Sequence, residues 1–192
     1  MPCCGRKRIM TQTLENTIEK DEIIDKKEKY LDRLLYNYEP YYDIKKFTEN
    51  EIGVPLRAEC VFDVHSEKYV LVKKAVLYEA DSHEYLYIFT APHFTKELYD
   101  SCHQTAYDRG MELVDPRPGH MYSYITALYI CDSCDLEVVK ALKKTRIRKN
   151  FLFSFRGWME FHNALVNVSD RTVVTNFSGR GNAKFLKKLL QH

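Results

Sequence analysis

No run of this sequence is long and apolar enough to cross a membrane. The longer uncharged runs, such as MYSYITALYIC at residues 121–131, fall well short of the ~20 residues that a spanning helix needs. The leading residues, MPCCGRKRIMTQ, are basic with no apolar segment behind them, unlike a secretory signal, and Pro2 replaces the glycine that myristoylation requires. We therefore expect a cytoplasmic protein with no membrane partner, whose six cysteines are reduced thiols or metal ligands.

The sequence also lacks the motifs of the common enzyme classes. It has no Walker loop, no Rossmann glycine fingerprint and no G-x-S-x-G elbow, and none of its seven histidines falls in H-x3-H or H-E-x-x-H spacing. In the segment DVHSEK, Glu67 and Lys68 are adjacent, so a strand would direct them to opposite faces, unlike the Glu-x-Lys of a metal nuclease. Because no catalytic set is complete, we expect a non-enzymatic binding or interaction domain.

Composition predicts one globular domain with an uneven distribution of charge. Hydrophobic residues make up 45% of the chain and charged residues 29%, and 192 residues suffice for a sizeable core. Residues 140–192 contain twelve Lys and Arg against two acidic residues, a net charge of +10, whereas residues 1–139 carry −8. Either the two parts neutralise each other in the fold, or a basic C-terminal face meets an anionic partner.

Hydrophobic periodicity predicts a flexible tail over residues 1–13 and an α+β domain over residues 14–192. An amphipathic helix is expected at 14–38, ending before Pro40, with an apolar stripe of Ile24, Leu31, Leu34, Leu35 and Tyr38. Its stripe must pack on the chain's own sheet or on a protein partner. Further helices are expected at 91–113 and 135–148, and a short basic one at 179–190.

The expected strands form a mostly antiparallel sheet with helices packed on it. Residues 56–64, 69–79 and 84–90 are rich in Val, Tyr, Phe and Ile and are separated by the polar breaks HSEK and ADSH, which predicts a three-stranded meander. A middle strand follows at His120–Ile130. A C-terminal hairpin is expected from 151–155, 158–168 and 171–177, with a bend or bulge at Gly157 and the phenylalanines of FLFSF in the core.

The segment CDSC, residues 131–134, invites three interpretations. A C-x-x-C at the start of a helix favours thiolates and therefore disulfide chemistry, but the carboxylates of Asp132 and Asp135 disfavour further negative charge. Asp132 or Ser133 could instead cap the helix. Structural zinc needs four ligands, and no second C-x-x-C accompanies Cys131 and Cys134. A redox pair, a zinc site and two buried free thiols all remain open, the last being favoured.

The stronger functional signal is the basic run KALKKTRIRKN at residues 140–150. Lysines in the last turn of a helix complement its dipole, but six basic residues in eleven exceed that need. A solvated face is the alternative. The glycine-rich turn SGRGNAK, residues 178–184, could hold a phosphate or serve only as a turn. The candidate residues for binding an anion such as nucleic acid or a phosphate ligand are Lys143, Lys144, Arg146, Arg148 and Arg180.

Three segments carry a family resemblance: EKYVLVKKAVLYEADSHEYLYIF, HMYSYITALYI and FSFRGWMEFHNALVNVSDRTVVTN. In their order the chain resembles an uncharacterised bacterial domain-of-unknown-function family of small cytoplasmic proteins, over about residues 25–190. Such families carry no assigned activity, so the resemblance implies no cofactor and no site residue.

Overall fold

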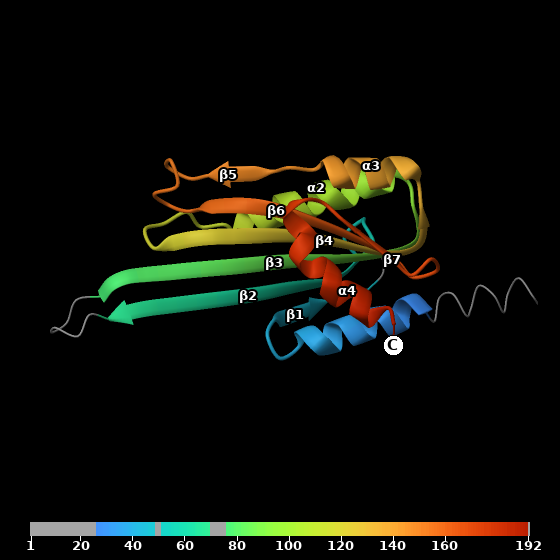
Figure 1. Cartoon of the computed structure of the whole chain (residues 1–192), viewed down its shortest axis with the longest axis horizontal. Helices are drawn as coiled ribbons and strands as arrows, with labels where there is room; N and C mark the ends of the chain where they lie inside the picture. The colour runs from blue at the N-terminus through green and yellow to red at the C-terminus, as the bar shows by residue number, and fades with distance from the viewer. Residues whose placement is uncertain (1–25, 49–50, 70–75, 192) are drawn as a thin grey trace, which may run out of the picture.

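A computed structural model describes residues 26–48, 51–69 and 76–191. The expected tail, and residues 14–25 of the expected first helix, lie outside this part of the chain. Figure 1 shows a sheet with helices on both of its faces. An N-terminal helix covers residues 26–38, and the other helices are α2 (Lys96–Leu113), α3 (Leu136–Lys144), the 3₁₀ helix η1 (Ser178–Asn182) and α4 (Ala183–Leu189).

The sheet has seven strands. Six follow the order β1-β2-β3-β4-β6-β5, and β7 pairs with the C-terminal end of β6, beyond the part that β5 covers. Their bounds are Asp43–Lys46 (β1), Leu56–Tyr69 (β2), Val76–Phe94 (β3), His120–Cys134 (β4), Arg148–Asn150 (β5), Trp158–Asn167 (β6) and Thr172–Thr175 (β7). β3 pairs with β4 and β4 with β6 in parallel, and the remaining pairs are antiparallel. The α+β class is confirmed, but the sheet is mixed, so the expected mostly antiparallel arrangement is wrong.

The two polar breaks expected in the meander are wrong, because β2 and β3 run through both of them. Residues 70–75 of the expected middle strand lie outside the part of the chain that the structure describes. Asp63 pairs with His83 and Ser66 with Ala80, so HSEK and ADSH lie inside one continuous ladder. Backbone groups make the ladder, so a polar stretch of sequence need not interrupt it. The sheet becomes mixed because α2 and α3 act as crossovers between parallel strands.

Both faces of the sheet carry a core, as the near-continuous apolar run of β4 requires. Ile125, Ala127 and Tyr129 face α2 and α3 in one core, while Leu128 and Ile130 face the N-terminal helix and α4 in the other. Because successive side chains of a strand point to opposite faces, this single strand contributes to both cores.

The N-terminal helix packs on the chain's own sheet. Leu31, Leu34 and Leu35 of the expected stripe are buried against the same core as Leu186 of α4. The Tyr30 hydroxyl donates a hydrogen bond to the Leu186 carbonyl at 3.1 Å, which joins the two helices. No helix within the described ranges has the length and apolarity to cross a membrane.

The segment FLFSF is a turn and not the expected strand. Leu152, Phe153 and Ser154 have φ values of 47°, 51° and 68°, in the left-handed region. Phe153 is 93% exposed and Phe155 84%, so these rings lie outside the core, whereas Phe151 is partly buried against it as expected. The turn ends at Gly157, where φ is 72° and a Cβ atom would lie 2.3 Å from the Met121 carbonyl oxygen.

Candidate functional site

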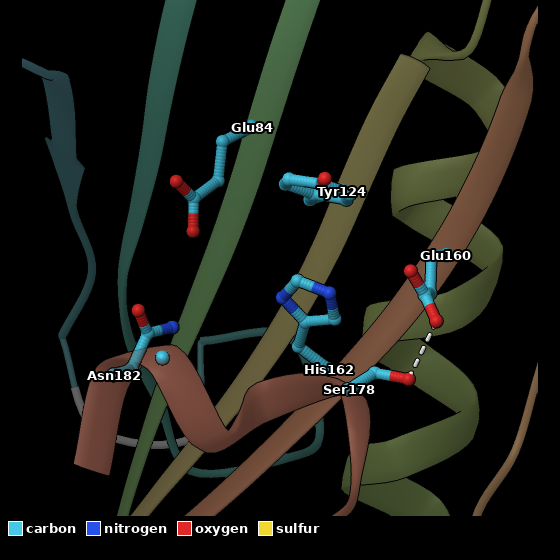
Figure 2. Close-up of a pocket in the computed structure, with 7 residues that line it drawn as sticks. Glu84, Tyr124, Glu160, His162, Ser178 and Asn182 are labelled. Atoms are coloured by element: carbon cyan, nitrogen blue, oxygen red, sulfur yellow. Dashed lines mark hydrogen bonds between the residues drawn. The ribbon is translucent and has the colours of Figure 1, made fainter.

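A polar cavity of 310 Å³ lies on the sheet face that also carries the N-terminal helix and α4. Glu84 of β3 points to the same face as Leu86 and Ile88, which enter the core there, because every second residue of a strand shares a face. Figure 2 shows side chains from β3, β4, β6 and η1 gathered around the cavity. The residues that line it are Glu84, Tyr124, Glu160, His162, Ser178, Gly181 and Asn182.

Strand register places the two carboxylates of the cavity in one row. Glu84 pairs with Tyr124 across β3 and β4, and Tyr124 pairs with Glu160 across β4 and β6. Directly paired residues of neighbouring strands point to the same face, so the Tyr124 side chain stands between the two carboxylates. Arg148 of β5 continues the row opposite Glu160, but its guanidinium lies over the ring of Trp158 at 5.0 Å.

Both carboxylates accept hydrogen bonds from hydroxyl groups. Glu84 accepts from the Tyr42 hydroxyl at 2.8 Å and from Thr126 Oγ1 at 3.2 Å, and Glu160 accepts from Ser178 Oγ at 2.7 Å. Neither forms an ion pair with a cationic side chain in the described part of the chain. Within the described residues, hydroxyl groups are therefore the hydrogen-bond partners of both carboxylates.

His162 brings an imidazole into the same space (Figure 2). Only 8% of the residue is exposed, and its ring centroid lies 4.5 Å from that of Tyr124. Among the described residues no group hydrogen-bonds its ring nitrogens. Burial lowers the pKa of His162 below its usual value of 6.5, and the nearby Glu160 carboxylate opposes this effect. The imidazole is therefore neutral at pH 7.

The buried Asn176 side chain fixes η1 beside the cavity. Its Oδ1 accepts from the backbone amides of Asn163 at 3.0 Å and Gly179 at 2.8 Å, while Nδ2 donates to the carbonyls of Thr145 and Phe161. A Cβ atom on Gly179 would lie 2.9 Å from the Asn163 carbonyl oxygen. Gly179 of SGRGNAK thus allows η1 to pack closely on β6. This is a structural role for the glycine, the alternative to holding a phosphate.

The predicted anion-binding residues lie among aromatic rings. Arg146 and Arg180, far apart in the sequence, both place their guanidinium groups over Phe177, at 4.9 and 3.7 Å from the ring centroid. Lys149 lies over Tyr107 at 5.1 Å. The aromatic partners come from other elements, which is why the basic run alone gave no sign of them.

The remaining candidates, Lys143 and Lys144, are exposed in the last turn of α3. Among the described residues neither lysine is paired with Arg146 or Arg180, so of these four residues only the two arginines come together, over Phe177. Lys143 and Lys144 complement the negative end of the α3 dipole.

The CDSC segment lies directly before α3, as expected, but it is the end of β4, which continues past the expected last residue Ile130 to Cys134. α3 begins at Leu136 with Asp135 at the N-cap position, while Asp132 forms an ion pair with Lys27 of the N-terminal helix. Neither predicted cap residue, Asp132 or Ser133, therefore occupies that position. The reason is that β4 continues to pair with β3, up to Phe94 opposite Cys134.

The two thiols are protonated at neutral pH. Burial, and next the neighbouring Cys134 thiol, raise the pKa of Cys131, and burial followed by the Asp135 carboxylate raises the pKa of Cys134. Both are free thiols. Within the described residues no group of three or more His, Cys, Asp and Glu side chains could hold a metal ion, so Cys131 and Cys134 have no further zinc ligands there.

A mixed sheet with helices on both faces makes this an α+β protein, and its candidate site is the polar cavity beside η1. Over residues 26–188 the chain matches the model of the domain of unknown function DUF8052, and it belongs to that family. No curated protein and no solved structure matches it. The resemblance to a domain-of-unknown-function family is confirmed, and the bacterial origin stays a prediction.

Proposed function

We propose that this protein is a non-enzymatic cytoplasmic domain that binds single-stranded nucleic acid along the basic edge of its sheet. The observation that carries the proposal is the arginine pair, Arg146 and Arg180, which shares the ring of Phe177. The pair joins the segment after α3 to η1, and both side chains are exposed.

Two guanidinium groups over one ring repel each other unless an anion lies near both. In the described part of the chain neither arginine is paired with a carboxylate. The planar guanidinium donates two parallel hydrogen bonds to a phosphate, so one phosphate can neutralise the pair. A partner that carries phosphate groups would therefore stabilise this arginine pair.

Exposed rings beside the basic residues favour a nucleic acid over a free phosphate ligand. Phe153 and Phe155 are exposed in the turn that follows β5, the strand that carries the exposed Arg148 and Lys149. Proteins that bind single strands combine a positive track for the backbone with aromatic side chains on which bases stack. The edge formed by β5 and this turn offers both.

Fluorescence anisotropy of a labelled single-stranded oligonucleotide, measured over a salt series, tests the proposal. Replacing both arginines (Arg146→Gln with Arg180→Gln) removes two phosphate contacts. The slope of log K against log salt should become shallower by about 1.4, at about 0.7 per contact. The matched control is Lys45→Gln with Lys46→Gln, which removes the same charge from β1 at the opposite end of the sheet.

The aromatic contribution is measured separately with Phe153→Ala and Phe155→Ala. These variants should weaken binding by about 1–3 kcal/mol per stacked base and leave the salt slope unchanged. Salt-independent binding, or an equal effect of the β1 control, would contradict the proposal. Binding of inorganic phosphate with no oligonucleotide affinity would assign the arginine pair to a small phosphate ligand instead.

A further inference from the structure

Among the described residues, the cavity of Figure 2 is lined by two glutamates and by no lysine or arginine, which is the charge that favours a bound cation. Its two carboxylates, Glu84 and Glu160, have only neutral hydroxyl partners in the described chain. A half-buried carboxylate loses part of its hydration, and an ion pair with a bound cation compensates for that loss. They line the same cavity from opposite sides of Tyr124 (Figure 2).

His162 provides an independent indication that a ligand belongs there. The residue is 8% exposed, it lines the cavity, and its ring nitrogens have no hydrogen-bond partner among the described residues. Because the ring lines the cavity, its nitrogens are available to a molecule that enters this space. A neutral imidazole offers one donor and one acceptor, and its acceptor nitrogen suits an N–H group.

The Tyr124 ring adds a third feature of a cation site. It stands between the two carboxylates and contacts the rings of Tyr122, at 4.6 Å, and His162, at 4.5 Å. An ammonium group near the face of an aromatic ring gains electrostatic stabilisation, and an alkyl chain gains apolar contact. Carboxylates combined with an aromatic wall thus favour an organic cation.

A metal ion fits these residues less well than an organic cation does. In the described ranges no three carboxylate, imidazole or thiol groups converge closely enough to hold a metal. The cavity, at 310 Å³, is at the lower end of the range for small-molecule sites, about 300–1,000 Å³. We infer that this cavity binds an alkylamine, with Glu84 and Glu160 as the carboxylates available to its ammonium groups and Tyr124 against its alkyl chain.

The ammonium group could belong to a free amine or to a lysine side chain of another polypeptide. Isothermal titration calorimetry of the full chain with 1,4-diaminobutane and with N-acetyl-lysine amide distinguishes these sources. Tighter binding of the first compound assigns a free diamine, and tighter binding of the second assigns a peptide side chain. The uncharged 1,4-butanediol has the same chain length and should not bind.

Replacing both carboxylates (Glu84→Gln with Glu160→Gln) should weaken amine binding at least ~tenfold, because a hydrogen bond to a charged group is lost at each position. The control, Glu97→Gln with Glu137→Gln, removes the same charge from exposed positions on α2 and α3 and should leave binding unchanged. Circular dichroism verifies that both variants are folded.

NMR of the histidine rings locates the ligand. The His162 ring resonances should shift on addition of the amine that binds, whereas those of the exposed His93 should not. The inference is overturned if neither amine binds at millimolar concentration, if the diol binds equally well, or if the two double variants lose affinity equally. The Arg146→Gln/Arg180→Gln variant should retain amine binding, so failure here is separate from failure of the nucleic-acid proposal.

Discussion

Breaking the Lys27–Asp132 ion pair should lower the free energy of unfolding far more than breaking an ordinary surface pair. It joins the N-terminal helix to the end of β4, and its side chains are only 7% and 13% exposed. Removing one partner of a buried pair leaves an uncompensated charge, which costs about 3–5 kcal/mol. Asp132→Ala or Lys27→Met should therefore each remove a large part of a total stability that is typically about 5–15 kcal/mol.

The double variant, Lys27→Met with Asp132→Ala, should be much less destabilised than the sum of the two single variants. With both charges removed, no ion is left buried, and the pair's desolvation cost disappears as well. Asp132 Oδ1 has no hydrogen-bond partner in the described structure, so its loss leaves no further group unsatisfied. We expect a coupling free energy of about 2–3 kcal/mol in this cycle.

Urea unfolding followed by circular dichroism measures these free energies. The exposed Lys96–Asp100 pair of α2 is the control, and its single variants should change stability by less than about 1 kcal/mol. If the Lys27 and Asp132 variants behave like this control, or if their effects simply add, the pair does not hold the N-terminal helix on the sheet.

Three further predictions follow from buried groups. Asn176→Ala should lower the free energy of unfolding by about 4 kcal/mol, at about 1 kcal/mol for each of four lost hydrogen bonds, as measured in urea. Stability should fall as the pH is lowered below about 6.5, because burial lowers the pKa of His103 and His162 in the folded state and the unfolded chain binds protons first. The slope should reach about 1.4 kcal/mol per pH unit for each histidine. In native protein, iodoacetamide should label Cys134 before the fully buried Cys131, as read by mass spectrometry.

Each of these has a contrary outcome. A cost below about 1 kcal/mol for Asn176→Ala would mean that η1 does not depend on this side chain. Stability that is flat between pH 7 and 5, or that is unchanged in its pH dependence by His162→Gln, would contradict the buried neutral imidazole. Equal labelling rates for the two cysteines would mean that the end of β4 opens readily.

Some parts of the candidate sites were within reach of sequence reasoning and others were not. Arg146 and Arg180 stand out as basic residues, but nothing local indicates that Phe177 brings them together. Glu84, Glu160 and His162 carry no motif, since each looks like an ordinary polar residue in a strand. Alternation along β3 and β6 indicates which face each occupies, but not which strand lies beside it.

Local pattern alone determined the apolar helix stripe around Leu31 and Leu34, the apolar run of β4 and the uneven distribution of charge. These depend on residues that are close in sequence, so periodicity is sufficient to find them. Only the tertiary structure decided that β3, β4 and β6 pair in parallel, that CDSC ends a strand, and that FLFSF is an exposed turn. Pairing between strands depends on crossovers and register over many tens of residues, and that register also places Glu84 and Glu160 on either side of Tyr124.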